Sequence, residues 1–140
     1  MLVALEGDDI DKSILRMAFE KRPCLLIDCS NSANPYRIHI EEEWLDEVFV
    51  INAEVIYRFR DALKKVRLEM NKLKLKVLLV TSLGALYSYS DAVEDKNVIM
   101  NCWELLKELS ADFEIFAAAD EYSGGFADET WDTQFLVKEW

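Results

Sequence analysis

The sequence predicts an α/β domain in which helices cover both faces of a mainly parallel sheet. Short apolar runs alternate with segments whose apolar residues recur every three or four positions, the pattern of strands alternating with amphipathic helices. Turn signals of the hairpin type are missing between these runs, which favours parallel pairing through right-handed crossovers. A chain of 140 residues is the usual size of one domain, so we expect a single three-layer unit over residues 1–140.

The first half of the chain contains three predicted strands. The run from Leu2 to Leu5 ends at Glu6-Gly7, and a helical spacing of apolar residues follows at Ile10, Ile14, Met17 and Ala18. Pro23 ends this helix, and residues 24–28 (CLLID) form a continuous apolar run typical of a strand covered on both faces. After a polar loop, residues 48–52 (VFVIN) are predicted to form the third strand.

The second half predicts two helices and three strands. Residues 55–73 form a long amphipathic helix whose far side is basic and whose apolar stripe is Val55, Ile56, Phe59, Leu63, Val66, Met70 and Leu73. A buried strand is expected at 77–80, and the apolar spacing over 98–109 is helical. The run 113–119 is a fifth strand, and 133–137 is a sixth after the Gly124-Gly125 turn. The acidic segment 120–132 between them is expected to be a flexible loop.

Composition excludes several classes of function. Lys and Arg number 16 against 27 Asp and Glu, a net charge of −11 that opposes direct binding to nucleic acid or anionic membrane. No apolar stretch approaches the ~20 residues of a membrane span, so we expect a cytoplasmic protein. The single histidine, His39, and three cysteines without CxxC spacing indicate no metal site and no disulfide framework. Cys24 and Cys29 should face opposite sides of their strand. No cofactor is expected.

The carboxyl ends of parallel strands are where ligands bind in open α/β sheets, and the first of these ends is followed by EGDDIDKS. A phosphate-binding loop has the pattern GxxxxGK(S/T), in which glycines let backbone amides approach phosphates and the lysine neutralises charge. Lys12 and Ser13 match the end of that pattern, but Glu6 and Asp11 stand where the two glycines should be. Lys12 and Ser13 are therefore candidate residues of a degenerate phosphate loop.

The acidic residues of this segment have a simpler explanation. Asp8 or Asp9 at the N-cap, with further acids in the first turn, would stabilise a helix by roughly 0.5–2 kcal/mol. Negative charge at this helix N-terminus also opposes phosphate binding. Ordinary helix capping is thus the alternative to a phosphate loop.

Two later segments resemble signatures of the archaeal RadA and eukaryotic recombinase family. Residues 26–38 (LIDCSNSANPYRI) resemble the family's IDTExxFxPERI, with matches at Ile27, Asp28, Pro35, Arg37 and Ile38. Residues 80–87 (VTSLGALY) resemble its VDSLTALF, with matches at Ser82, Leu83, Ala85 and Leu86. The segments occur in the family's order over about residues 1–120, and TQFLVK near the end is similar to a later strand of the family. The resemblance implies a RecA-like fold in which the first and fourth strands are neighbours.

The departures from the family pattern lie at its chemical positions. The family's catalytic glutamate falls at Ser30, and a serine cannot activate water as a base at neutral pH. The acid that holds the magnesium shell falls at Thr81, a poor ligand for a hard cation. With both loop glycines also replaced, the resemblance implies an inactive homologue of the ATPase, with no catalytic residue.

Candidate partner-binding residues lie elsewhere. The segment that grips DNA in the family is acidic here, whereas residues 58–76 hold eight Lys and Arg against two acids. A solvated helix face or a contact for an acidic partner explains this charge, the latter through Arg58, Lys64, Lys65 and Arg67. Residues 116–119 (FAAA) are similar to the FxxA tether that links recombinase subunits, but a buried strand predicts core packing for them. Trp140 is a further candidate contact, and a homodimer is expected.

Three functions follow as hypotheses. The resemblance implies a non-catalytic RadA-like paralogue that binds proteins or acts as a scaffold subunit, in DNA recombination or repair, with a recombinase or repair protein as partner. The second is a nucleotide-binding module that uses Lys12 and Ser13. The third is a regulatory subunit similar to KaiC-like domains and unrelated to recombination.

Overall fold

A computed structural model describes residues 1–33, 47–87 and 93–135 of the chain. Within them lies one six-stranded sheet, all parallel, in the order β3-β2-β4-β5-β1-β6. The strands are β1 (Leu2–Glu6), β2 (Cys24–Asp28), β3 (Val48–Asn52), β4 (Val77–Val80), β5 (Glu114–Ala118) and β6 (Glu129–Asp132). The helices are α1 (Ile10–Glu20), α2 (Ile56–Leu73), α3 (Gly84–Tyr87) and α4 (Val93–Leu109), with 3-10 turns η2 (Ser123–Gly125) and η3 (Thr133–Phe135).

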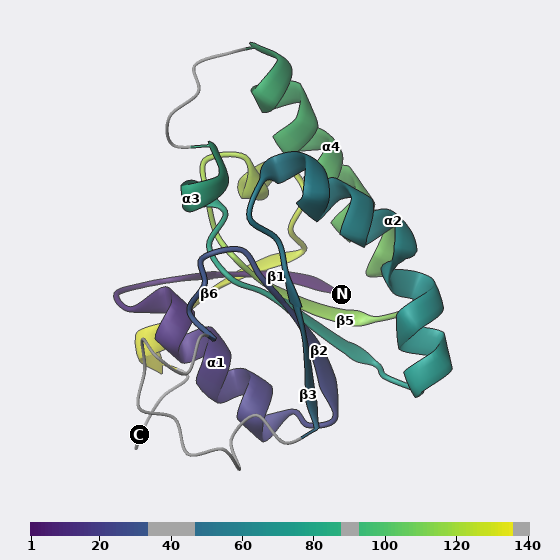
Figure 1. Cartoon of the computed structure of the whole chain (residues 1–140). Helices are drawn as coiled ribbons and strands as arrows, with labels where there is room; N and C mark the ends of the chain where they lie inside the picture. The colour runs from purple at the N-terminus through teal and green to yellow at the C-terminus, as the bar shows by residue number, and fades with distance from the viewer. Residues whose placement is uncertain (34–46, 88–92, 136–140) are drawn as a thin grey trace.

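Helices cover both faces of this sheet, as the sequence predicts. Figure 1 shows α1 on one face and α2 with α4 on the other. Each face has its own apolar cluster: Ile14, Met17 and Ala18 of α1 pack on one side, and α2 and α4 pack on the other around Phe59 and Trp103. The three-layer α/β architecture is therefore confirmed, with every described strand pair parallel.

The apolar runs 24–28 and 77–80 form two interior strands of the sheet, β2 and β4. β2 is buried along its whole length, and β4 is buried except for Val77, which is half-buried. Successive side chains of a strand point to opposite faces, and Cys24 and Cys29 accordingly lie in the two different apolar clusters. The predicted opposite orientation of these cysteines is confirmed. The FAAA segment is also confirmed as core, since Phe116 is fully buried in β5.

The long helix α2 follows its predicted stripe except at the two ends. Ile56, Phe59, Leu63, Val66 and Met70 are buried against the sheet and α4. By contrast, Val55 and Leu73 are 47% and 37% exposed. Lys74 ends the helix in the left-handed region at φ 58°, with its N–H donating to the carbonyls of Met70 and Asn71.

The sixth strand lies earlier in the sequence than predicted. β6 spans Glu129–Asp132 beside β1, and Thr133–Phe135 form η3 instead, while residues 136–137 of the predicted strand lie outside the described residues. Only one large apolar side chain marks this edge strand: the ring of Trp131 packs on Phe116 with the centroids 5.7 Å apart. The position of β6 is therefore set by its pairing with β1 and by this ring contact. A run of four residues is too short for side-chain periodicity to reveal a strand.

The predicted adjacency of the first and fourth strands is wrong. β5 lies between β1 and β4 and pairs with both of them. A fifth strand that joins the middle of a sheet can be placed only by long-range pairing, which the order of segments along the chain does not reveal. Because all three strands are parallel, the carboxyl ends of β1 and β4 still come to the same edge of the sheet.

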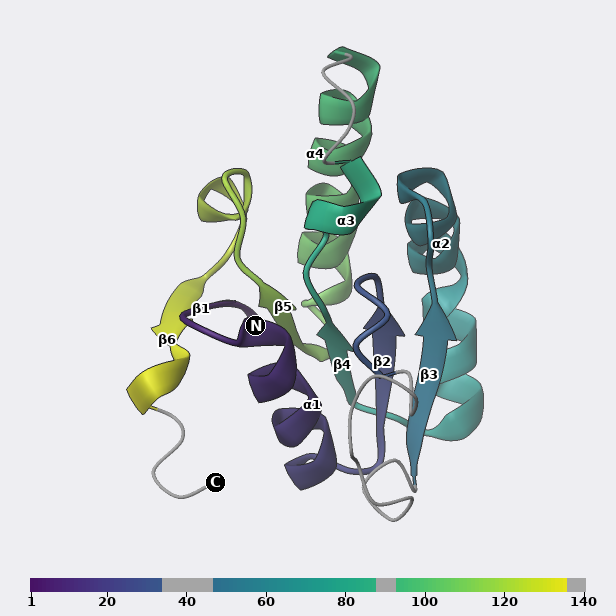
Figure 2. The same ribbon diagram turned by 60° about the vertical axis from the view of Figure 1, so that its left-hand side comes forward.

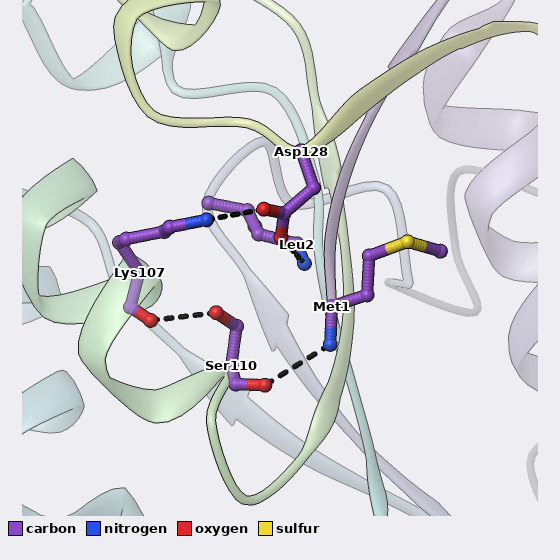
Figure 3. A network of polar contacts seen from close by, with 5 residues as sticks. All are labelled: Met1, Leu2, Lys107, Ser110 and Asp128. Atoms are coloured by element: carbon purple, nitrogen blue, oxygen red, sulfur yellow. Dashed lines mark hydrogen bonds and ion pairs between the residues drawn. The ribbon is translucent and has the colours of Figure 1, made fainter.

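The segment 120–132, predicted to be a flexible loop, contains regular structure. Asp120 Oδ1 accepts hydrogen bonds from the N–H groups of Tyr122 and Ser123 at 2.8 and 2.9 Å, and the segment ends in β6. Asp128 Oδ2 accepts the Leu2 N–H at 2.8 Å, while its Oδ1 pairs with the Lys107 ammonium (Figure 3). These bonds tie the segment to β1 and α4.

The start of β1 is held by the same network. The Met1 ammonium donates to the Ser110 carbonyl at 3.0 Å, and the Ser110 hydroxyl donates to the Lys107 carbonyl at 2.6 Å (Figure 3). The end of α4 therefore positions the strand that leads to the first candidate site. Among the described residues, no helix has the length and apolar character needed to cross a lipid bilayer.

Candidate functional site

A polar cleft of about 590 Å³ opens at the carboxyl ends of β1 and β6. Lys12, Ser13 and Arg16 of α1 line it, opposite Asp132 and its two successors at η3, Thr133 and Gln134. Gly7, Asp8 and Asp9 complete the lining. The two predicted residues Lys12 and Ser13 thus lie at one open cavity, as the phosphate-loop alignment suggests, but carboxylates share that cavity with them.

Helix α1 begins at this cleft without a side-chain cap. Asp9 is the N-cap residue, in the left-handed region at φ 50°, and its carboxylate makes no capping hydrogen bond. Ser13 N–H donates to the Asp9 carbonyl at 3.1 Å, which closes the first helical turn. Asp9 therefore occupies the predicted N-cap position, but its side chain makes no hydrogen bond that caps the helix.

Gly7 is the residue that lets the loop after β1 pass beneath η3. Its φ of 135° is a conformation that side chains rarely adopt. A Cβ at this position would stand 2.4 Å from Thr133 Oγ1, and Thr133 is buried. The cleft wall at residues 132–134 is thus packed directly on the glycine, a contact between segments that are far apart in sequence.

Asp11 connects this loop to the segment after β4. Its Oδ1 accepts hydrogen bonds from the Ser82 N–H at 2.7 Å and from the Ser82 hydroxyl at 2.9 Å. The residue that replaces the second glycine of a phosphate loop therefore reaches across the end of β5 to the second signature segment. In the phosphate-loop pattern Asp11 counts as a missing glycine, whereas in the structure its carboxylate holds Ser82 by two hydrogen bonds.

The ends of β2 and β4 are joined by a buried polar cluster around Asp28 and Thr81. Asp28 is 2% exposed and Thr81 is fully buried. Thr81 Oγ1 donates to Asp28 Oδ1 at 3.0 Å and accepts the N–H groups of Cys29 and Ser30 at 2.7 and 3.2 Å. The carboxylate also accepts the N–H groups of Ser32 at 3.1 Å and Ala33 at 2.9 Å. Donors from protein groups therefore surround both carboxylate oxygens of Asp28.

This cluster occupies the positions where the resemblance places catalytic chemistry. Thr81, at the magnesium position, holds the backbone of the loop after β2. Ser30, at the catalytic glutamate position, shares a hydrogen bond of 2.6 Å with the Ser32 hydroxyl. The remaining matches of the first signature, Pro35, Arg37 and Ile38, lie outside the described residues, as does His39.

The predicted partner-binding residues divide between two sides of α2. Arg58, Lys64, Lys65 and Arg67 are all exposed. Arg67 pairs with Asp112 and lies 5.7 Å from the centre of the Phe113 ring, while Lys64 is on the side near Cys102 of α4. Lys65 points instead to the other side, where α2 meets β3. The other candidate, Trp140, is outside the described residues.

An apolar groove of about 440 Å³ lies where α2 meets β3, and sequence reasoning missed it. Phe49 and Ile51 of β3, together with Ala62 and Leu73 of α2, contribute to its lining along with Leu25, Val66, Lys65 and Glu69. We call this surface the β3–α2 groove. The signal that could have found it is the combination of an uncharged edge strand with a helix stripe that continues to Leu73.

The three cysteines are buried free thiols. Burial raises the pKa of Cys24 to about 11, against a smaller lowering by Arg22, and raises that of Cys102 to about 12. Burial, and then the Asp28 carboxylate, raises the pKa of Cys29 as well. Thiols with raised pKa values are poor nucleophiles, so none of them is a candidate catalytic residue.

Within the described ranges, no group of three or more His, Cys, Asp or Glu side chains is arranged to hold a metal ion. A comparison with models of known protein families found no match to the chain, and a comparison with curated proteins found none either.

Proposed function

We propose that this chain is a non-catalytic, RecA-like domain that acts as a protein-binding or scaffold subunit in DNA recombination or repair. The proposal combines the resemblance of the two signature segments with the parallel three-layer fold. The strand order argues against its RecA-like part, because β5 lies between β1 and β4 where the resemblance implies that they are neighbours. One observation carries its non-catalytic part: the buried Thr81 hydroxyl, at the magnesium position, donates to Asp28 and accepts the backbone N–H of Ser30, the residue at the water-activation position.

The closed cluster supports this view because phosphoryl transfer requires charged groups that face a ligand. Thr81 uses its hydroxyl to hold the loop after β2, and Asp28 already receives donors on both oxygens. A magnesium ion would have to displace these buried hydrogen bonds, each of which is costly to leave unmade. Asp11 is likewise engaged by Ser82.

A protein-binding role is supported by the surface of α2 and β3. Phe49 and Leu73 on this surface are 41% and 37% exposed, which leaves large apolar side chains uncovered near the β3 edge of the sheet. The basic side chains of α2 stand out in a chain of net charge −11. An exposed apolar surface with a polar and charged rim is typical of a site for a protein partner.

The test is a pair of measurements on the purified full chain. We expect no magnesium-dependent ATP hydrolysis above background, and we expect affinity purification from cells to recover a protein stoichiometrically. ATP hydrolysis that is lost in a Lys12→Ala variant would contradict the non-catalytic part. A recovered partner without any connection to DNA would favour the KaiC-like regulatory alternative.

A second candidate function, nucleotide binding without hydrolysis, is favoured by the cleft at α1. Lys12 and Ser13 line an open cavity, and the N-cap residue Asp9 does not cap the helix. Against it, Asp8, Asp9 and Asp132 line the same cavity, and carboxylates repel phosphates. Calorimetric titration with a non-hydrolysable ATP analogue tests whether the cleft binds a nucleotide. Heat of binding that disappears in Lys12→Ala but remains in Lys96→Ala, a control at an exposed lysine of α4, would support this candidate.

A further inference from the structure

The β3–α2 groove has features that identify its occupant. We propose that it binds an acidic amphipathic helix of a different protein, which packs alongside α2 as an additional helix of that layer. The proposal rests on the protein-binding function above and names the surface and the chemistry of the partner. Three observations carry it: an exposed apolar seam, a row of cations that form no ion pair among the described residues, and the spacing of that row.

The seam lies at the open end of a helical layer. α4 flanks α2 on one side, and on the other side α2 borders the β3 edge of the sheet (Figure 2). The groove walls include Ala62, Val66 and Leu73 of α2, which are four and seven residues apart and so lie on one side of the helix, where a partner helix can contact them. Phe49 reaches the same groove from the strand and is 41% exposed.

A row of cations borders the seam. Arg58, Lys65 and Lys72 are separated by seven residues each, so they project from nearly the same side of α2. Within the described part of the chain, none of the three forms an ion pair, although Arg67 and Lys107 do. Glu69 lies on the groove wall and Asp61 lies on the same side of α2, so this side of the helix carries three cations against two acids, a net charge of +1.

The spacing of the cations favours a helix over an extended segment. Seven residues of α-helix rise about 10.5 Å, so the row spans about 21 Å. A parallel or antiparallel partner helix with one carboxylate in every seven residues repeats at the same interval. An extended strand presents side chains on one face about every 6.8 Å, out of step with the row. A helix can therefore meet all three cations while its apolar residues fill the seam.

The charge beside the groove also favours a different protein over a second copy of this chain as the occupant. If two copies joined through this groove about a two-fold axis, the same cation row would face itself. Like charges opposite one another oppose such a pairing. Nucleic acid would satisfy the cations but would leave Phe49 and Leu73 uncovered. An acidic helix with an apolar side satisfies both parts of the surface.

A designed peptide tests this chemistry with the full chain. The probe is a fluorescein-labelled helix of 21 residues, with leucine at two seam positions and glutamate at one flanking position of each heptad. We expect its fluorescence anisotropy to rise on titration with the protein, and the affinity to fall as salt is raised. A second peptide with glutamine at the flanking positions should bind at least about fivefold more weakly.

The chain offers a matched pair of variants on adjacent residues. Lys65→Glu reverses a charge at the groove and should weaken binding at least about fivefold, whereas Lys64→Glu makes the same change on the side near α4 and should leave affinity within about twofold. Leu73→Ser should weaken binding by removing apolar contact. All three positions are exposed, so folding is retained, and far-UV circular dichroism checks this.

Several results would overturn the proposal. Equal effects of Lys64→Glu and Lys65→Glu would show a diffuse charge attraction, and tight binding by a peptide with two interior prolines would show an extended occupant. A dimer in light scattering that Leu73→Ser dissolves would assign the groove to a second copy. Binding of single-stranded DNA that Lys65→Glu abolishes would assign the row to nucleic acid. A cellular partner retained fully by both Lys65→Glu and Leu73→Ser would leave the proposed function standing while refuting this surface.

Discussion

Replacing Thr81 with valine tests whether the buried cluster at the ends of β2 and β4 is a structural element. Valine keeps the shape of threonine but removes the hydroxyl. The Cys29 N–H then loses its acceptor at 2.7 Å and the Ser30 N–H loses its acceptor at 3.2 Å, while Asp28 Oδ1 loses one donor and keeps the Ser32 N–H. The loss of its acceptor costs ~1–3 kcal/mol for each N–H group, so we expect a loss of about 2–6 kcal/mol in the free energy of unfolding.

Urea denaturation followed by tryptophan fluorescence measures this loss, because Trp103 is fully buried in the apolar cluster around α4. Thr81→Ser is the matched control, since it keeps the hydroxyl and loses one methyl group at a cost of about 1 kcal/mol. A second control, Thr130→Val, makes the same threonine-to-valine change at an exposed site of β6. It should change the free energy of unfolding by no more than about 0.5 kcal/mol. If Thr81→Val were no less stable than Thr81→Ser, the cluster would not hold the loop after β2, and the argument for a closed, non-catalytic arrangement would fail.

Three further predictions concern the loop after β1, the pH dependence of stability and the thiols. Gly7→Ala should destabilise the fold by about 1–3 kcal/mol, because of its positive φ and the close Thr133 hydroxyl; an unchanged urea midpoint would refute this. The hydrogen bond from Lys107, and then that from the Leu2 N–H, lowers the pKa of Asp128, so this carboxylate stabilises the fold above its unfolded pKa of about 3.9 and loses that contribution as pH falls through its folded pKa. Asp128→Asn should therefore lower the urea midpoint at pH 7 and have a smaller effect at pH 3, and an equal effect at both values would contradict this. All three cysteine thiols are buried with raised pKa values, so Ellman's reagent should react with them only after denaturation, and rapid reaction of the native protein would show an unexpected opening.

The candidate site shows where sequence reasoning succeeds and where it stops. Lys12 and Ser13 could be placed at the end of the first strand because strand and loop are adjacent in the chain. The opposite wall at Asp132 and Thr133 could not, since its position depends on β6 pairing with β1. The bond from Ser82 to Asp11 likewise needs the order of β1, β5 and β4. The β3–α2 groove depends on which strand is left at the edge of the sheet.

By itself the sequence determined the α/β class, the buried strands β2 and β4 and the stripe of α2, because side-chain periodicity and apolar runs act locally along the chain. The placement of Ser30 and Thr81 at acid positions of the RadA family stays a prediction from the resemblance. Only the tertiary structure decided the strand order, the place of β6 and the partners of Asp11 and Asp28. The physical reason is that hydrogen bonds and packing between distant segments depend on the complete sheet, whereas periodicity describes one element at a time.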